Sequence, residues 1–134
     1  MPDFEAPPVL VVEDNPTDLK LVRVLLELEG YTVTTAGSAE EALALLGHLQ
    51  PLMLLVDIDL PGMSGLDLAS RLRAAPARST LPILAMSSTA GSDAPGLAAS
   101  AGCDGFLVKP IDVGRFSAAI ARATARRPPQ ASTT

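Results

Sequence analysis

The sequence predicts an α/β protein of the doubly wound class, with five parallel strands and five helices around one sheet. Three observations predict it: short, continuously apolar runs, segments with helical spacing between them, and a length of 134 residues that suits one domain. Parallel strands need a crossover connection, usually a helix, so the alternation of the two kinds of segment favours a sheet covered on both faces.

An apolar run and a helix cap predict the first strand and helix. Residues 9–12 (VLVV) are apolar throughout, as in a strand that is buried on both faces. Asn15 and Pro16 then supply an N-cap and a first-turn proline, and apolar residues recur at helical spacing until Gly30.

The second strand and helix follow directly. Residues 31–36 (YTVTTA) are rich in β-branched side chains, which favour a strand. Ser38 and Glu41 have the spacing of a capping box, in which each residue satisfies a backbone N–H of the other. The Ala- and Leu-rich segment after them predicts a helix up to Leu49.

Three more apolar runs predict strands at residues 52–56, 81–86 and 106–108. Helical spacing predicts a helix between the first two runs that ends near Pro76, and Asp112 can cap a last helix that Pro128 stops. The segment between the last two strands contains Gly and few large apolar residues. A short or mobile helix capped by Ser92 or Asp93 is expected there.

Composition and charge exclude several classes of protein. Ten Lys and Arg against fifteen Asp and Glu give a net charge of −5, which suits neither a nucleic-acid backbone nor an anionic membrane. No apolar run approaches the ~20 residues that span a bilayer. The single cysteine, Cys103, cannot form an internal disulfide and is expected to be a small buried residue. We therefore expect a cytoplasmic protein with no direct nucleic-acid or membrane partner.

Four of the five expected strands end in a polar group that can bind or react. Glu13 and Asp14 follow the first strand, Asp57 the third, Ser87 the fourth and Lys109 the fifth. Ligands of open α/β sheets bind beyond the carboxyl ends of the strands, where the strand order reverses. If the first and third strands are neighbours, three carboxylates converge and need a cation. Ligands that are all oxygen suit Mg²⁺, with Mn²⁺ as an alternative.

A carboxylate that faces a divalent ion, an ammonium group and a hydroxyl group can accept a phosphoryl group as an aspartyl phosphate. Asp57 would be the nucleophile. Lys109 and the metal would offset the charge on the phosphoryl oxygens, and Ser87 would donate a hydrogen bond to one of them.

Four fragments, in order, resemble the receiver domain of two-component response regulators: VLVVEDN, LLVDIDLPGMSG, the serine after LPILAM, and FLVKP. The resemblance implies the flavodoxin-like receiver fold, with strand order 2-1-3-4-5. It makes Asp57 the phosphoacceptor and implies that Ser87 and Lys109 contact the phosphoryl group. The metal ligands that it implies are Asp57, Asp14 directly, Glu13 through water and Asp59 through its backbone carbonyl.

The same resemblance implies a switch and its partners. Phe106 stands where the family carries an aromatic residue whose rotamer couples to the hydroxyl group, and Asp59 and Thr89 would tune the lifetime of the phosphate. A histidine kinase or histidine phosphotransferase would be the donor. The fourth helix, fifth strand and fifth helix would signal to a protein target. Formation of a homodimer is left open. Such a protein catalyses at most its own phosphorylation and dephosphorylation.

The main alternative is an enzyme. The fragment DIDLP is similar to the DxDx[TV] motif of haloacid-dehalogenase-like phosphatases, in which Asp57 would also be the nucleophile. Against it, Pro61 replaces the expected Thr or Val, and the motif follows the third strand instead of the first. A pseudo-receiver that is not phosphorylated is a further alternative. We expect a flexible lead at residues 1–7, a receiver domain at 8–127 and a disordered tail at 128–134.

Overall fold

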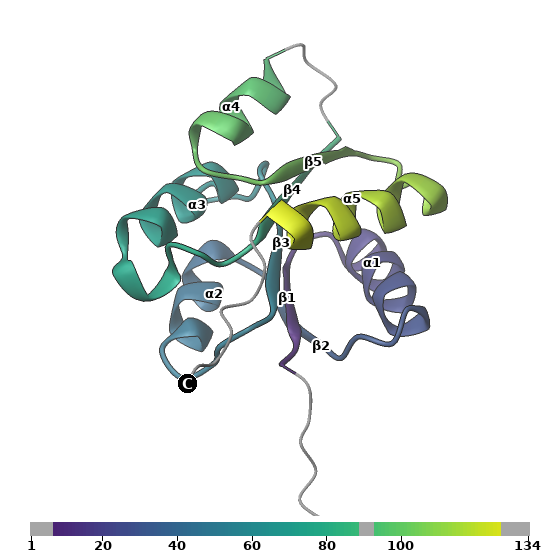
Figure 1. The fold of residues 1–134 in the computed structure, drawn as a ribbon, viewed down its shortest axis with the longest axis horizontal. Coiled ribbons are helices and arrows are strands. Elements are labelled where there is room, and N and C mark those ends of the chain that lie inside the picture. Colours follow the sequence, from purple (N-terminus) through teal and green to yellow (C-terminus); the bar gives the residue numbers. More distant parts are fainter. Residues whose placement is uncertain (1–6, 89–92, 127–134) are drawn as a thin grey trace, which may run out of the picture.

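The fold comes from a computed structural model that describes residues 7–88 and 93–126. Five strands form one sheet with helices on both faces, as Figure 1 shows. The strands are β1 (Val9–Val12), β2 (Val33–Ala36), β3 (Met53–Asp57), β4 (Ile83–Ser87) and β5 (Gly105–Val108). The helices are α1 (Pro16–Leu28), α2 (Ala39–Leu46), α3 (Gly65–Ala74), the 3-10 helix η1 (Pro76–Arg78), α4 (Ala94–Ser100) and α5 (Val113–Arg126). The predicted doubly wound α/β class is confirmed.

The strand order is β2-β1-β3-β4-β5, and each neighbouring pair is parallel. This is the order that the resemblance implied. The register aligns Val12 of β1 with Val56 of β3. The next residues along the chain, Glu13 and Asp57, therefore lie beside each other at the carboxyl edge of the sheet.

The sheet separates two apolar cores. Alternate residues of a strand point to opposite faces, so Leu10 and Val12 of β1 join one core while Val9 and Val11 join the other. Helices α2, α3 and α4 cover the first face, and α1 and α5 cover the second (Figure 1). Burial on both faces explains why these strands are apolar runs without polar alternation.

Two predicted N-caps stabilise the N-terminal ends of α1 and α5. The Asn15 side chain accepts a hydrogen bond from the Asp18 backbone N–H at 3.0 Å. Asp112 accepts one from the Arg115 backbone N–H, also at 3.0 Å. Both predictions are confirmed. The first cap also fixes the loop that leads from β1 into α1, where the acidic residues lie.

The capping box predicted for α2 is wrong in one half. Ser38 accepts a hydrogen bond from the Glu41 backbone N–H at 3.0 Å, as expected. The Glu41 carboxylate, however, accepts from the backbone N–H of Gly37 at 2.8 Å, one residue before the cap. The helix itself ends at Leu46, earlier than predicted, with Gly47 at its C-cap.

Helix α4 has only seven residues, which confirms the prediction of a short helix. Asp93 lies at its N-cap, but its side chain makes no capping hydrogen bond to the described residues. The prediction of an Asp93 side-chain cap is therefore wrong, and the alternative cap, Ser92, lies outside the described residues. Within the described part of the chain, no helix is long and apolar enough to cross a membrane.

Candidate functional site

Three carboxylates converge at the carboxyl edge of β1 and β3. Glu13 and Asp57 are buried, with 1% and 5% of their surface exposed, whereas Asp14 is exposed. One carboxylate oxygen from each residue lies within 4.8 Å of the others. The parallel pairing of β1 with β3 produces this cluster, because both strands end at the same edge of the sheet. The predicted convergence is confirmed.

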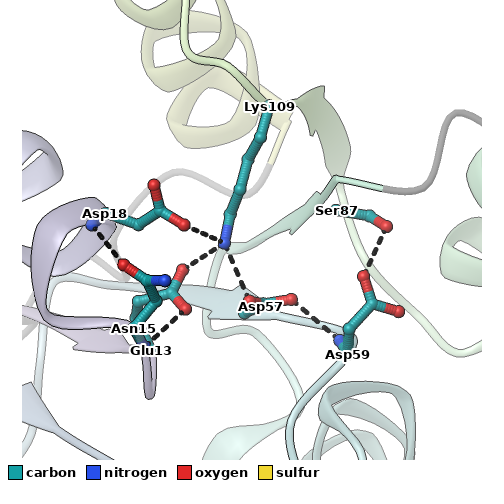
Figure 2. A network of polar contacts seen from close by, with 7 residues as sticks. All are labelled: Glu13, Asn15, Asp18, Asp57, Asp59, Ser87 and Lys109. Carbon is teal, nitrogen blue, oxygen red and sulfur yellow. Dashed lines mark hydrogen bonds and ion pairs between the residues drawn. The ribbon is translucent and has the colours of Figure 1, made fainter.

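Lys109 inserts its ammonium group into this cluster from the end of β5, as Figure 2 shows. The Nζ atom lies 2.5 Å from Glu13 Oε1, 2.8 Å from Asp57 Oδ2 and 3.0 Å from Asp18 Oδ2. An ammonium group has three N–H donors, so three carboxylates can engage all of them. The peptide bond between Lys109 and Pro110 is cis, as the sequence allowed.

A second chain of hydrogen bonds surrounds Asp57. The backbone N–H of Asp59 donates to Asp57 Oδ1 at 2.8 Å. The side chain of Asp59 in turn accepts from the Ser87 hydroxyl at 2.7 Å (Figure 2). Ser87 is completely buried at the end of β4. Both oxygens of the Asp57 carboxylate are therefore held in place from opposite sides.

Burial and neighbouring charges shift the pKa values of Glu13, Asp57 and Lys109 in different directions. Burial raises the pKa of Glu13 to about 7, and the Asp57 carboxylate adds to the rise while Lys109 opposes it. Burial would also raise the pKa of Asp57, but hydrogen bonds from Lys109 and the Asp59 N–H bring it below its ordinary value. Burial would lower the pKa of Lys109, yet its contacts with the carboxylates raise it. At neutral pH, Asp57 is therefore an ionised carboxylate beside a charged ammonium group.

Three further residues singled out in the sequence are Phe106, Thr89 and Cys103. Phe106 is half-buried on β5 and packs against the core under α2, α3 and α4. Thr89 lies outside the described residues. Cys103 is buried, which agrees with its predicted role in packing, and burial raises the pKa of its thiol to about 11.

Sequence reasoning missed Asp18 as part of the site. It lies in the first turn of α1, where an acidic residue is ordinary because it complements the helix dipole. Its partner, Lys109, is 91 positions away along the chain. The local signal that could have found Asp18 is its place in the first turn of α1, directly after the acidic loop that follows β1.

Comparison with known proteins gives consistent results. The family model described as "Response regulator receiver domain" matches residues 9–121. The chain is 35% identical over 108 residues to the polar-differentiation response regulator DivK of Brucella ovis, which covers 81% of this chain and 88% of DivK. It is 39% identical over 104 residues to an uncharacterised 14.6 kDa protein of Leptolyngbya boryana, over 78% of this chain and 79% of that one.

Solved structures show the same likeness. A CheY-like response regulator receiver domain protein from Methanospirillum hungatei superposes with a TM-score of 0.80 and 26% identity, over 90% of this chain and 95% of that chain. The response regulator TrrA of Thermotoga maritima, solved in complex with Mg²⁺ and BeF, gives a TM-score of 0.78 and 26% identity, over 88% and 99% of the two chains. The strand order and the acidic edge agree with these matches, and the chain belongs to the response regulator receiver domain family.

Proposed function

We propose that this protein is a phosphorylation switch in which Asp57 accepts a phosphoryl group from a phosphohistidine on a histidine kinase or histidine phosphotransferase. One observation carries the proposal. The ionised Asp57 carboxylate belongs to a cluster of three acidic residues, and its Oδ2 atom lies 2.8 Å from the Lys109 ammonium nitrogen. This arrangement provides a nucleophile together with a fixed positive charge beside it.

The acidic cluster suits a divalent cation. Glu13, Asp14 and Asp57 offer oxygen ligands only, and their charges repel one another unless a cation offsets them. Oxygen ligands favour Mg²⁺, or Mn²⁺ in its place, and Asp59 would add its backbone carbonyl. When bound, the ion would neutralise negative charge on the phosphoryl oxygens.

Asp57, Lys109 and Ser87 would carry out the other steps of phosphoryl transfer. An oxygen of Asp57 forms the new bond to phosphorus, while the P–N bond of the phosphohistidine breaks and its electron pair stays on the imidazole. Lys109 donates a hydrogen bond to a phosphoryl oxygen. Ser87 donates another once its hydroxyl leaves the Asp59 carboxylate, which it contacts at 2.7 Å in the resting structure. The chain would thus catalyse at most its own phosphorylation and dephosphorylation.

Incubation with acetyl phosphate and Mg²⁺, followed by intact mass measurement, tests the proposal. We expect the native protein to gain one phosphoryl group and Asp57→Asn to gain none, because the amide is a poor nucleophile. Removal of Mg²⁺ with a chelator should prevent the gain in the native protein. Asp67→Asn, at an exposed position in α3, is the control and should label like the native protein. Labelling of Asp57→Asn would refute the assignment of Asp57 as the phosphoacceptor. Continuous release of phosphate from many phosphate esters would favour the alternative of a haloacid-dehalogenase-like phosphatase.

The signal would leave through the face formed by α4, β5 and α5. Phe106 lines two hollows of this face: a groove of about 440 Å³ beside α5 and a smaller one of about 160 Å³ beside α4. Because Phe106 lines both hollows, a change in its rotamer would alter the shape of this face, which supports a switch role for Phe106. A target protein would bind this face and read its state, and a homodimer could use the same face.

Hydrogen exchange tests this route. Helix α4 is short and lacks a side-chain cap among the described residues, so its local stability is expected to be low. Addition of beryllofluoride, which mimics a phosphoryl group, should change amide protection in α4 and β5 but leave the distant β2 unchanged. Equal protection with and without beryllofluoride in a protein that binds it would contradict this choice of face.

A further inference from the structure

Asp18 contacts Lys109 but is not one of the clustered carboxylates. The cluster found among the described residues contains Glu13, Asp14 and Asp57. Asp18 Oδ2 accepts from Lys109 Nζ at 3.0 Å. Its side chain is 36% exposed, whereas that of Glu13 is completely buried. The ammonium group therefore has two inner partners that also belong to the candidate metal cluster, and one outer partner that does not (Figure 2).

The hydrogen bonds that hold the backbone around Asp18 do not involve Asp57. The backbone N–H of Asp18 donates to the Asn15 side chain at 3.0 Å, which caps α1. The backbone N–H of Asn15 donates to Glu13 Oε2 at 3.1 Å. Two local hydrogen bonds thus fix the first turn of α1 against the end of β1. The backbone of Asp18 is therefore held without a direct hydrogen bond to the phosphoacceptor.

We propose that Asp18 is a positioning residue that holds the Lys109 ammonium group ready for the phosphoryl group. The inference rests on the proposed function and deepens it. A divalent ion would share the charges of Glu13 and Asp57, and phosphorylation would alter Asp57 itself. Among the described partners of Lys109, Asp18 is the one whose charge neither event takes up. It keeps one N–H of the flexible lysine side chain engaged while another turns to a phosphoryl oxygen.

Electrostatic repulsion between Asp18 and the incoming phosphoryl group opposes the positioning effect of Asp18. Asp18 adds a negative charge near the site that receives a negatively charged group, so its removal could also favour phosphorylation. Its partial exposure lets water and salt screen that longer-range repulsion, whereas the contact with Lys109 is direct. We therefore expect the loss of Asp18 to weaken the site, and the sign of the effect tests the inference.

The experiment compares Asp18→Asn and Asp18→Ala with the native protein at saturating Mg²⁺. Calorimetry gives the affinity for beryllofluoride, and intact mass gives the rate of labelling by acetyl phosphate. We expect Asp18→Ala to lower both by about fivefold, in keeping with a partly exposed charged contact. Asp18→Asn keeps an oxygen acceptor, so its affinity for beryllofluoride and its labelling rate should lie between those of the native protein and of Asp18→Ala. Mg²⁺ affinity should change less than about twofold, because Asp18 is outside the cluster.

Two controls separate positioning from a structural role. Asp67 occupies the same place in α3, where its backbone N–H donates to the N-cap Ser64 at 3.1 Å, and it is exposed. Asp67→Ala removes an equivalent helix-dipole charge and should leave both measurements unchanged. In a Lys109→Met background, Asp18→Ala should have no further effect, because Asp18 acts through that lysine.

The outcomes distinguish a failure of the proposed function from a failure of the inference about Asp18. A native protein that neither labels nor binds beryllofluoride would overturn the proposed function and this inference together. Normal native behaviour with Asp18→Ala equal to or better than native would overturn the inference alone. An effect of Asp18→Ala that persists without Lys109 would also overturn it.

Discussion

Lys109→Met should lower the free energy of unfolding by about 3 kcal/mol near pH 8 without Mg²⁺, because it leaves buried carboxylates without their counter-charge. The Lys109 side chain is 8% exposed, and those of Glu13 and Asp57 are 0% and 7% exposed. Methionine fills a similar volume, so the change removes charge more than packing. Urea unfolding at several pH values measures the loss.

The pH dependence of this loss has a defined sign. A carboxylate with a raised pKa in the folded state keeps its proton when the unfolded chain has lost it, so stability falls as pH rises. In the native protein this applies to Glu13, between its ordinary pKa of 4.5 and about 7. Lys109→Met removes the group that lowers the pKa of both buried carboxylates, so its stability should fall more steeply with pH and recover when Mg²⁺ is added.

The matched control is Lys20→Met, at an exposed position of α1. It removes the same charge from the surface and should change stability by less than about 0.5 kcal/mol. If Lys109→Met behaved like Lys20→Met across the pH range, the buried ammonium group would not be the counter-charge of the site.

Gly65→Ala should also be strongly destabilising, by about 3 kcal/mol, and should impair labelling of Asp57. Gly65 begins α3 and lies against the backbone at the end of β3. An added Cβ would lie 2.8 Å from the Cα of Ile58 and closer still to the backbone oxygen of Asp57. These neighbours are backbone atoms, which cannot turn away as a flexible side chain can. The methyl group would therefore displace the segment that carries the phosphoacceptor.

Gly96→Ala provides the control for Gly65→Ala. Gly96 lies within α4, and outside the adjoining backbone of that helix no described atom lies within 4 Å of the Cβ that alanine would add. Alanine favours a helix over glycine by up to about 1 kcal/mol, so this variant should be at least as stable as the native protein. Urea unfolding and acetyl phosphate labelling compare the two variants. A Gly65→Ala protein with native stability and labelling would show that the close approach is unimportant.

The sheet could be predicted from local sequence because buried parallel strands leave a strong signal. The run from Val9 to Val12 is apolar at every position, and both faces of β1 are buried. The acidic residues of the site could be predicted for a related reason. Glu13 and Asp57 interrupt apolar surroundings at the ends of strands, where parallel topology gathers them at one edge.

Other features depend on contacts that no local pattern encodes. The hydrogen bond from Ser87 to Asp59 joins residues 28 positions apart and depends on how the loop after β3 turns. The contact between Asp18 and Lys109 joins α1 to the end of β5. The opposite pKa shifts of Glu13 and Asp57 arise from burial and from the sharing of one ammonium group, which only the folded arrangement determines.

Locating the phosphoryl group on the chain tests the central claim most directly. Borohydride reduces an acyl phosphate of aspartate to homoserine, which peptide mass spectrometry identifies by position. After labelling with acetyl phosphate and Mg²⁺, we predict homoserine at position 57 and at no other aspartate. Reduction at another residue, or stable phosphate on a hydroxyl or imidazole group with none at Asp57, would contradict the account.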